Sequence, residues 1–378
     1  MTAPLPPPPD DGTVLDRRTL NRTLLARQLL LERVHLRPAE ALERLVGLQA
    51  QNPGDPYVAL WSRLAAFDPL ELSRLLETRA AVRLTVMRGT LHLVTAADAG
   101  PLRAVMQADV ARMLRSTHFW RNLQGADVDA IVSRGIELVE EQPRSVAELA
   151  RILAAEWPDR DPDSLGYAVR YLVPLAQVTP RGLWGRTGSA RVTTLRSWLG
   201  IPRPPEPDPA AAMLRYLSTF GPAHTSDMRA WSGLRNLRPV IARLRPALRS
   251  YRDEAGRELL DVPDGVFAEP EAPAPVRFLP EFDNAFLSHA ERSRITGDDR
   301  WNAAYARQGV ILADGFFAGS WRLPRVPGRP PRLDIVTNAA YDGLPHTARA
   351  EVEEEGRRLA AFLRPDDPPP SVHFARRG

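Results

Sequence analysis

The sequence of 378 residues contains neither cysteine nor lysine. Without cysteine, the chain cannot form disulfides, thiolate zinc sites, iron–sulfur clusters or a cysteine nucleophile. Without lysine, all 50 side chains that carry a fixed positive charge are arginine, and no lysine amine is present for Schiff-base catalysis. Arginine favours phosphate, because its planar fork pairs with oxyanions through two hydrogen bonds.

Motifs of several common enzyme classes are missing as well. The seven histidines are scattered, with no HExxH and no close pair at ligand spacing, so we expect neither a metal site nor a cofactor. The sequence also has no GxSxG, no GxxxxGKS and no GxGxxG after a strand-like run. Ser288 and His289 are adjacent, but neighbours on a strand point to opposite faces, so we interpret this pair as structural.

Long apolar runs are absent too, and none approaches the roughly 20 residues that span a membrane. The N-terminal stretch MTAPLPPPPDDG has no basic start and no apolar core. We therefore predict a disordered proline-rich leader over residues 1–14 in place of a signal peptide. The expectation is a cytoplasmic protein that does not associate with membranes.

The net charge of +4 is modest, but the charges are unevenly distributed along the chain. Residues 164–205 hold six arginines, residues 228–252 hold seven and residues 315–333 hold four, and none of these blocks contains an acid. Separated signs of this kind predict a basic surface that binds a polyanion. Ordinary solvated arginine is the alternative interpretation.

The chain is long enough for two to four structural units, and one order of elements recurs in it. Residues 15–125 begin with helical patterns and end in two β-rich runs around Arg88 and Gly89. The same order, helices followed by a β-hairpin, returns in residues 126–203 and 204–275, which the proline-rich IPRPPEPDP stretch separates. Three copies predict tandem winged helices around a concave basic groove, within an α+β fold.

Residues 276–378 follow a different pattern. Three strand-like runs, PVRFLPEFDNAFL, GVILADGFFAGSWRL and RLDIVTNA, precede a helical pattern that spans residues 346–363. We expect Gly315 or Gly319 to turn the tip of a hairpin. The prediction is a small β-barrel-like region closed by a C-terminal helix.

The stretch from Leu45 to Tyr57, LVGLQAQNPGDPY, carries two carboxamides, Gln49 and Gln51. The preceding helical pattern stops at Gly47 and two prolines follow, so the segment should be extended or tightly turned. In an extended segment both amides share one face and Ala50 points into the core. Two amides on one face can hold one water molecule, although a glutamine pair after a helix more often caps backbone carbonyls.

Four stretches together resemble one known family. LVGLQAQNP, YVALWSRL, MRGTLHLV and FLPEFDNAFLSHAERSRI look like the pattern of the AlkZ and YcaQ group of bacterial winged-helix DNA glycosylases. The resemblance runs from about Leu15 to about Phe362 and includes a Gln-hydrophobic-Gln catalytic motif that falls on residues 49–51. Because the YcaQ motif ends in Asp, this sequence is more similar to the AlkZ branch, which resists crosslinking natural products.

The resemblance implies a monofunctional glycosylase that acts on alkylated purines of the 7-alkylguanine type, including interstrand crosslinks, in double-stranded DNA. It implies roles in base excision repair or self-resistance, and we expect a monomer. The alternative is a non-catalytic winged-helix DNA-binding protein or regulator, for which basic wings suffice. The candidate catalytic residues are Gln49 and Gln51, and the candidate assisting carboxylates are Asp55 and Asp283. The candidate DNA contacts are Arg88, Arg181, Arg186, Arg191, Arg235, Arg243 and Arg322.

Overall fold

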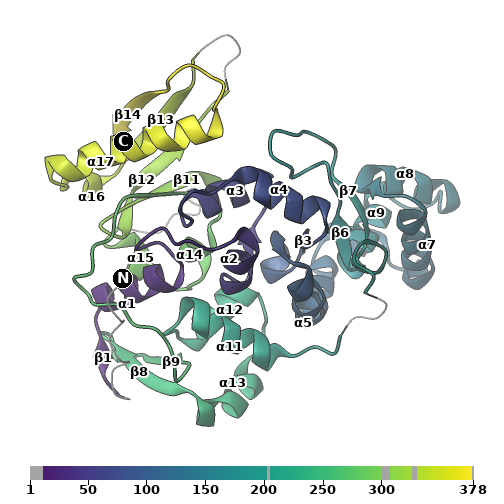
Figure 1. The fold of residues 1–378 in the computed structure, drawn as a ribbon. Coiled ribbons are helices and arrows are strands. Elements are labelled where there is room, and N and C mark those ends of the chain that lie inside the picture. The colour runs from purple at the N-terminus through teal and green to yellow at the C-terminus, as the bar shows by residue number, and fades with distance from the viewer. Residues whose placement is uncertain (1–11, 202–204, 300–306, 326–329, 377–378) are drawn as a thin grey trace.

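Three β-sheets with helices packed around them organise the chain (Figure 1). The computed structural model describes residues 12–201, 205–299, 307–325 and 330–376. Among these residues the sheets have six, three and five strands. The predicted mixture of helices and sheets, an α+β fold, is confirmed.

The first segment contains the helices and hairpin that the sequence predicts, with one additional helix. Its elements are β1 (Val14–Leu15), α1 (Arg17–Arg27), α2 (Pro38–Arg44), β2 (Leu48–Gln49), α3 (Asp55–Trp61), α4 (Pro69–Glu77), β3 (Ala81–Thr85) and β4 (Leu91–Thr95). The sequence does not predict helix α3, because Pro53 and Pro56 are expected to prevent helix formation in this stretch. Pro56 lies in the first turn of α3, where a proline lacks only a hydrogen bond that the helix would not make.

The second segment adds an arm of helices, on the right in Figure 1. Its elements are α5 (Ala96–Arg115), α6 (His118–Asn122), α7 (Val128–Glu141), β5 (Arg144–Ser145), α8 (Val146–Glu156), α9 (Pro162–Leu172), β6 (Leu175–Gln177), β7 (Arg191–Thr194) and α10 (Leu195–Leu199). Ser145 and Glu148 form the capping box that the sequence predicts for α8, with Ser145 N donating to Glu148 Oε2 over 2.7 Å.

The hairpins of these two segments belong to one sheet. Its strand order is β2-β4-β3-β6-β7-β5, and the two segments join where β3 pairs with β6, with Arg83 opposite Gln177. The predicted boundary at residue 125 therefore falls between parts that share a sheet.

The third segment is joined to the start of the chain. It comprises α11 (Pro209–Phe220), α12 (Thr225–Ser232), α13 (Arg238–Leu244), β8 (Arg249–Asp253) and β9 (Glu258–Asp261). Strand β1 pairs in parallel with β8, placing Val14 opposite Arg252, and Gly12 N donates to Ser250 O over 2.8 Å. The last residues of the predicted leader are thus ordered, while residues 1–11 lie outside the described part.

The C-terminal region is an open sheet, so the prediction of a small barrel is wrong. It contains β10 (Arg277–Leu279), α14 (Asn284–Leu287), α15 (Ser293–Thr296), β11 (Gly309–Ala313), β12 (Phe316–Arg322), β13 (Arg332–Thr337), α16 (Ala339–Asp342), α17 (His346–Leu363) and β14 (Ser371–Arg376). The order β10-β11-β12-β13-β14 leaves β10 and β14 at opposite edges. Helix α17 packs on the sheet, with Gly356 close to Leu333 and Phe278. This contact buries the apolar face of the sheet, which closing the sheet into a barrel would otherwise bury. Gly315, with φ +79°, turns the β11–β12 hairpin as predicted.

All four segments contribute to one apolar core. A single cluster includes Leu24, Leu84, Met106, Trp231 and Phe317. The residues between 125 and 203 also have a cluster of their own, which includes Ile131, Leu149 and Val169, and the predicted division of the chain stays a prediction.

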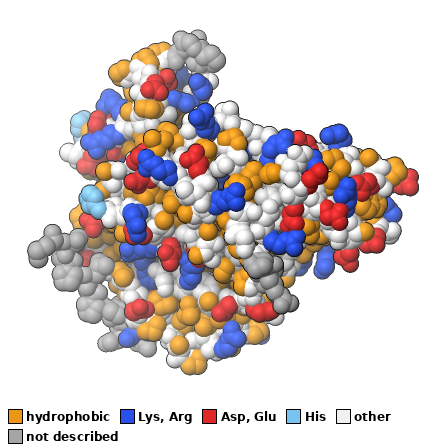
Figure 2. All heavy atoms as spheres, turned by 45° about the vertical axis from the view of Figure 1, so that its right-hand side comes forward, with side chains coloured by type: hydrophobic (Ala, Val, Ile, Leu, Met, Phe, Trp, Pro, Cys, Tyr) orange, Lys and Arg blue, Asp and Glu red, His pale blue; other side chains and the backbone are white. Residues whose placement is uncertain are grey.

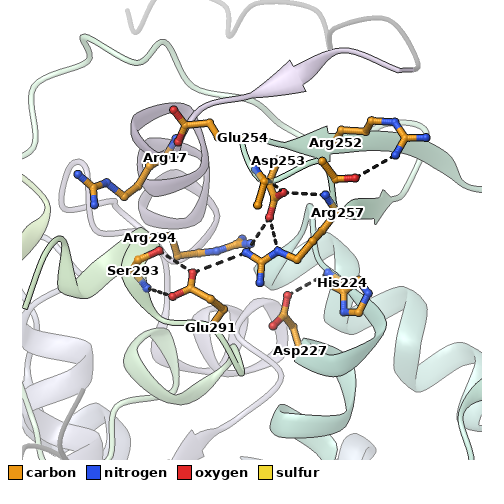
Figure 3. A network of polar contacts seen from close by, with 12 residues as sticks. Arg17, His224, Asp227, Arg252, Asp253, Glu254, Arg257, Glu291, Ser293 and Arg294 are labelled. Carbon is orange, nitrogen blue, oxygen red and sulfur yellow. Dashed lines mark hydrogen bonds and ion pairs between the residues drawn. The ribbon is translucent and has the colours of Figure 1, made fainter. Parts of the chain in front are cut away.

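A buried ion pair fastens α1 to the third segment. Arg27 makes two hydrogen bonds to Asp261 at 2.8 and 2.7 Å, and both side chains are buried. Nearby, a polar network joins β8 and β9 to α15, with Arg257 between Asp253 and Glu291 (Figure 3). The carboxylates drawn there already accept hydrogen bonds from arginine, serine or backbone N–H groups, so we interpret this network as structural.

The Arg27–Asp261 pair generates a stability prediction. Asp261→Ala should lower the free energy of unfolding by about 3–5 kcal/mol, because removing one partner leaves a buried charge uncompensated. Urea denaturation followed by circular dichroism would measure this. As a control, Arg357→Ala, which removes the partner of Glu353 in an exposed pair on α17, should leave the unfolding free energy almost unchanged. A similar small effect for both variants would show that the buried pair does not hold α1 in place.

Candidate active site

The Gln49–Gln51 loop lies at the edge of the six-stranded sheet, between α2 and α3. Gly47, with φ +85°, turns the chain from α2 into β2, and a Cβ there would lie 2.6 Å from Val94 Cγ1. Ala50 is fully buried, as predicted. The strand ends at Gln49, so the alternation expected to place both amides on one face does not extend regularly to Gln51. Gln49 is 6% exposed, whereas Gln51 is an exposed residue.

Arg88 fixes the amide of Gln49. This arginine lies in the β3–β4 turn with φ 56°, and its Nη2 donates to Gln49 Oε1 over 2.6 Å and to Asn284 Oδ1 over 2.9 Å. Its Nη1 donates to Trp231 O over 2.8 Å, and Asn284 Nδ2 donates to Gly47 O over 3.3 Å. Four segments distant in the sequence therefore meet at one guanidinium beside the candidate catalytic loop.

His92 completes the surroundings of Gln49. The two residues are opposite each other in the β2–β4 ladder, and His92 is fully buried. Burial and the positive charge of Arg88 lower the pKa of His92 to about 3. The ring is therefore neutral, with Nδ1 placed 3.1 Å from Thr90 O, where it can donate. Burial lowers the pKa of Arg88 to about 10, so the guanidinium stays charged at neutral pH.

Asp55 lies just after the loop, at the start of α3. It is 8% exposed and accepts a hydrogen bond from Asn52 N over 3.1 Å. Burial raises the pKa of Asp55 to about 8, and the nearby charge of Glu281 acts in the same direction. Asp55 is consequently largely protonated at pH 7. Glu281 itself accepts a hydrogen bond from Asn52 Nδ2 over 3.0 Å, which brings a second carboxylate to the loop.

Asp283 is committed to other contacts. Its two oxygens accept hydrogen bonds from Arg63 at 2.8 and 2.9 Å, and both side chains are buried. Oδ1 also accepts from Ala285 N and caps α14. This is the arrangement of a structural ion pair, and its geometry gives no support to an assisting role for Asp283. The neighbouring residues Glu281 and Asn284, in contrast, reach the loop.

The predicted DNA-contacting arginines have different surroundings, and their role stays a prediction. Arg88 points inward, as described above. Arg181 is half-buried and donates to Gly188 O over 2.9 Å, while Arg191 donates to Glu148 Oε1 over 2.6 Å. The other four are exposed, namely Arg186, Arg235, Arg243 and Arg322.

Arginines of the acid-free blocks often pair with acids from elsewhere. Arg196 pairs with Glu140, and Arg245 pairs with Glu258. On the face shown in Figure 2, blue and red side chains are correspondingly interspersed. The charge separation along the sequence is therefore only partly preserved in space.

One basic hollow does lie next to Arg88. It has a volume of about 530 Å³ and is lined by Arg88, Arg112, Arg229 and Arg235 from three segments of the chain. Arg229 belongs to one of the predicted basic blocks, whereas Arg112 lies outside all three blocks and is not predicted from the sequence to contact DNA. Arg229 and Arg235 are exposed, and the guanidinium of Arg88 connects this hollow to Gln49.

Two further observations concern other chemistry. Within the described residues, no group of three or more histidine, aspartate or glutamate side chains could hold a metal ion. Ser288 and His289 do contact each other, with Oγ 2.8 Å from Nδ1, because they follow the short helix α14 and are not part of a strand. Both are buried, and His289 Nε2 lies 3.1 Å from Phe220 O, so neither faces a substrate.

The described helices include none that is both long and apolar enough to cross a membrane.

Comparison with known proteins identifies the family. A family profile described as DNA glycosylase AlkZ-like matches residues 42–362. An interstrand DNA cross-link repair glycosylase from Streptomyces sahachiroi is 27% identical over 334 residues, covering 79% of this chain and 85% of that protein. The solved structure of the Streptomyces sahachiroi DNA glycosylase AlkZ has a TM-score of 0.72 and 20% identity, covering 96% of this chain and 100% of that one. These matches favour the enzyme over the non-catalytic regulator, and the chain belongs to the AlkZ-like DNA glycosylase family.

Proposed function

We propose that this DNA glycosylase hydrolyses the N-glycosidic bond of purines alkylated on N7 in double-stranded DNA, and that crosslinked purines are among its substrates. The observation that carries the proposal is the Gln49–Ala50–Gln51 loop, in which one amide is fixed by Arg88 and the other is exposed. The name of the Streptomyces sahachiroi relative supports the crosslinked substrate. We further propose that the enzyme is a cytoplasmic monomer without a cofactor, acting in base excision repair or self-resistance.

The chemistry of the substrate explains why two neutral amides suffice. A purine alkylated on N7 carries a positive charge, which weakens the bond between its N9 and the sugar C1′. When this bond breaks, its electron pair goes to the base, which leaves neutral, while an oxocarbenium ion develops on the sugar. Water then adds to C1′ and releases a proton to solvent. The step therefore depends on a placed water and on dipoles aimed at the cation.

The two amides have different roles in this proposal. Arg88 occupies one lone pair of Gln49 Oε1, so Gln49 is a rigid support whose second lone pair remains for water. In the described part of the chain, no hydrogen bond holds the Gln51 side chain, so its amide can orient the attacking water. Gln51 carries no negative charge, which restricts the enzyme to good leaving groups. The absence of lysine leaves the N-terminal amine as the one amine that could form a Schiff base with the resulting abasic site, and we propose that the enzyme is monofunctional.

Substitution of Gln51 tests the amide pair. Gln51→Ala should lower single-turnover release of 7-methylguanine by roughly 100-fold, as loss of one preorganised dipole does in other active sites, with little change in binding to lesion DNA. Gln51→Asp should keep activity or extend it to poorer leaving groups, because a carboxylate stabilises the developing cation.

Melting temperatures measured on the same preparations provide the control. If the amides only cap backbone groups, both substitutions should lower the melting temperature, and activity should fall in proportion to the folded fraction. Wild-type turnover by a folded Gln49→Ala, Gln51→Ala double variant would disprove the catalytic assignment.

The raised pKa of Asp55 predicts a pH dependence. If Asp55 assists as a carboxylate, base release should increase as the pH rises through about 8, and this increase should be absent in Asp55→Asn. Stability should change in the opposite direction. Between about pH 4 and pH 8 the native state keeps a proton that the unfolded state has lost, so the free energy of unfolding should fall as pH rises. Urea denaturation across this range should show the fall in the wild type and not in Asp55→Asn, and identical pH profiles for the two proteins would contradict the assignment.

The exposed arginines predict a salt dependence. The logarithm of the affinity for undamaged duplex should fall linearly with the logarithm of salt concentration, by about 0.9 per phosphate contacted. Arg186→Ala and Arg235→Ala should each reduce the magnitude of this slope by about 0.9, the contribution of one phosphate contact. Fluorescence anisotropy would measure the affinities. Arg134→Ala, which removes an arginine paired with Glu137 and Glu156 on the arm, should not. An unchanged slope in all three variants would show that these arginines do not contact phosphate.

A further inference from the structure

A small pocket lies beside Gln51, on the face of the six-stranded sheet that carries Arg83 and Gln177. Its volume is about 220 Å³, and α5, α9 and the connection between β6 and β7 contribute to its walls. The polar residues that line it are Gln51, Thr85, Gln177 and the arginines Arg83, Arg103, Arg170 and Arg181. The pocket thus shares one wall with the candidate catalytic loop.

Several buried polar atoms of this pocket have no partner among the described residues. Arg83 is 2% exposed and donates through Nη2 to Ala50 O over 2.7 Å, but its Nε and Nη1 are unpaired. Arg103 is also 2% exposed, and its Nη2 donates to Tyr171 O over 3.0 Å, while Nη1 is unpaired. Gln177 Oε1 is unpaired as well. Unpaired buried donors are rare in proteins, because a donor that loses its water without gaining a partner destabilises the fold.

The charges of the pocket are also unbalanced. Burial lowers the pKa of both Arg83 and Arg103 to about 10, so both guanidinium groups stay charged at neutral pH. Among the residues that the structure describes, no acidic side chain lines the pocket. The carboxyl whose charge acts on Arg83 is that of Asp55, which is itself largely protonated at pH 7. An anion that entered the pocket would be attracted by both cations.

The shape and chemistry of the pocket favour a phosphate group over a nucleobase. No aromatic side chain lines it, whereas pockets that receive a flipped base generally stack it on aromatic or apolar side chains. Its volume of about 220 Å³ is below the roughly 300–1,000 Å³ of typical organic-ligand sites. Phosphate oxygens are strong acceptors for the N–H groups of arginine, and four arginines line this pocket.

We propose that this pocket binds a backbone phosphate of the DNA strand that carries the alkylated purine, next to the reacting nucleotide. The proposal rests on the glycosylase function proposed above and assigns a phosphate subsite to it. Arg83 is a positioning residue in this arrangement, because one guanidinium would hold both the phosphate and the Ala50 carbonyl. The sugar attached to that phosphate would then be fixed against Gln51.

Neutral phosphate analogues test the subsite. A series of duplexes would each carry 7-methylguanine and a single uncharged methylphosphonate, at successive positions around the lesion. Binding and single-turnover base release would be measured with the wild type, Arg103→Met and Arg181→Met. We expect one position at which the methylphosphonate weakens wild-type binding by roughly tenfold, as loss of a charge-assisted hydrogen bond does. Arg103→Met and Arg181→Met should lose this sensitivity at that position alone.

The control variant is Arg196→Met, which alters an exposed arginine paired with Glu140 outside the pocket. It should keep the wild-type sensitivity at every position. A scan without a sensitive position, or a sensitive position that Arg103→Met and Arg181→Met leave unchanged, would overturn the proposal. Should Arg103→Met fail to melt cooperatively, Arg181→Met at the half-buried edge of the pocket gives the same readout.

Inorganic phosphate distinguishes a DNA backbone site from a site for a free anion. If phosphate raises the wild-type melting temperature through Arg103 but the methylphosphonate scan is flat, the pocket binds a free anion and the proposal is wrong. Failure of the glycosylase function itself would be recognised separately, as a lack of base release from unmodified lesion duplex by the wild type. The binding scan does not require base release, so the two failures are distinguishable.

Discussion

The structure around the candidate active site depends on one buried guanidinium. Arg88 joins the β3–β4 turn to Gln49, Asn284 and the Trp231 carbonyl, which come from three other parts of the chain. Each of these three acceptors is a neutral oxygen, so none of them balances the charge of the guanidinium. A buried cation satisfied in this way is costly to form but rigid once formed, since moving any acceptor would expose an unpaired donor. The loop is therefore held by the assembly of the whole fold and not by its local sequence.

Local sequence signals predict most of the elements correctly. The capping box at Ser145, the turn at Gly315 and the end of helix α2 before Gly47 all depend on residues within a few positions of each other. The resemblance to the glycosylase family likewise directs attention to the Gln49–Gln51 loop from sequence alone. Helix α3 escapes prediction because the same proline chemistry that breaks a helix interior is favourable in its first turn.

Long-range contacts cannot be predicted in the same way. Arg88 is expected to face DNA, yet its guanidinium reaches Asn284, which lies 196 residues later in the sequence. Asp283 lies in the FLPEFDN stretch that resembles the family, but its carboxylate is bonded to Arg63. Glu281 and Asn284, in the same stretch, make the contacts with the loop and with Arg88. The basic blocks look free of acids in the sequence because their partners, such as Glu140 and Glu148, lie in other segments. The sequences of the C-terminal strands do not indicate whether their sheet stays open or closes into a barrel.

The pairing of α1 with the third segment has a consequence for synthesis on the ribosome. Asp261 follows Arg27 by 234 residues. At about 5–20 residues per second, α1 waits on the order of 10–50 seconds for its partner to be made. During that interval Leu20, Leu24 and Leu25, all buried in the finished protein, have no third segment to cover them. The nascent chain therefore leaves these three leucines of α1 without their partners for most of its elongation, and the candidate catalytic loop, which needs Asn284 as well, is among the last parts to become ordered.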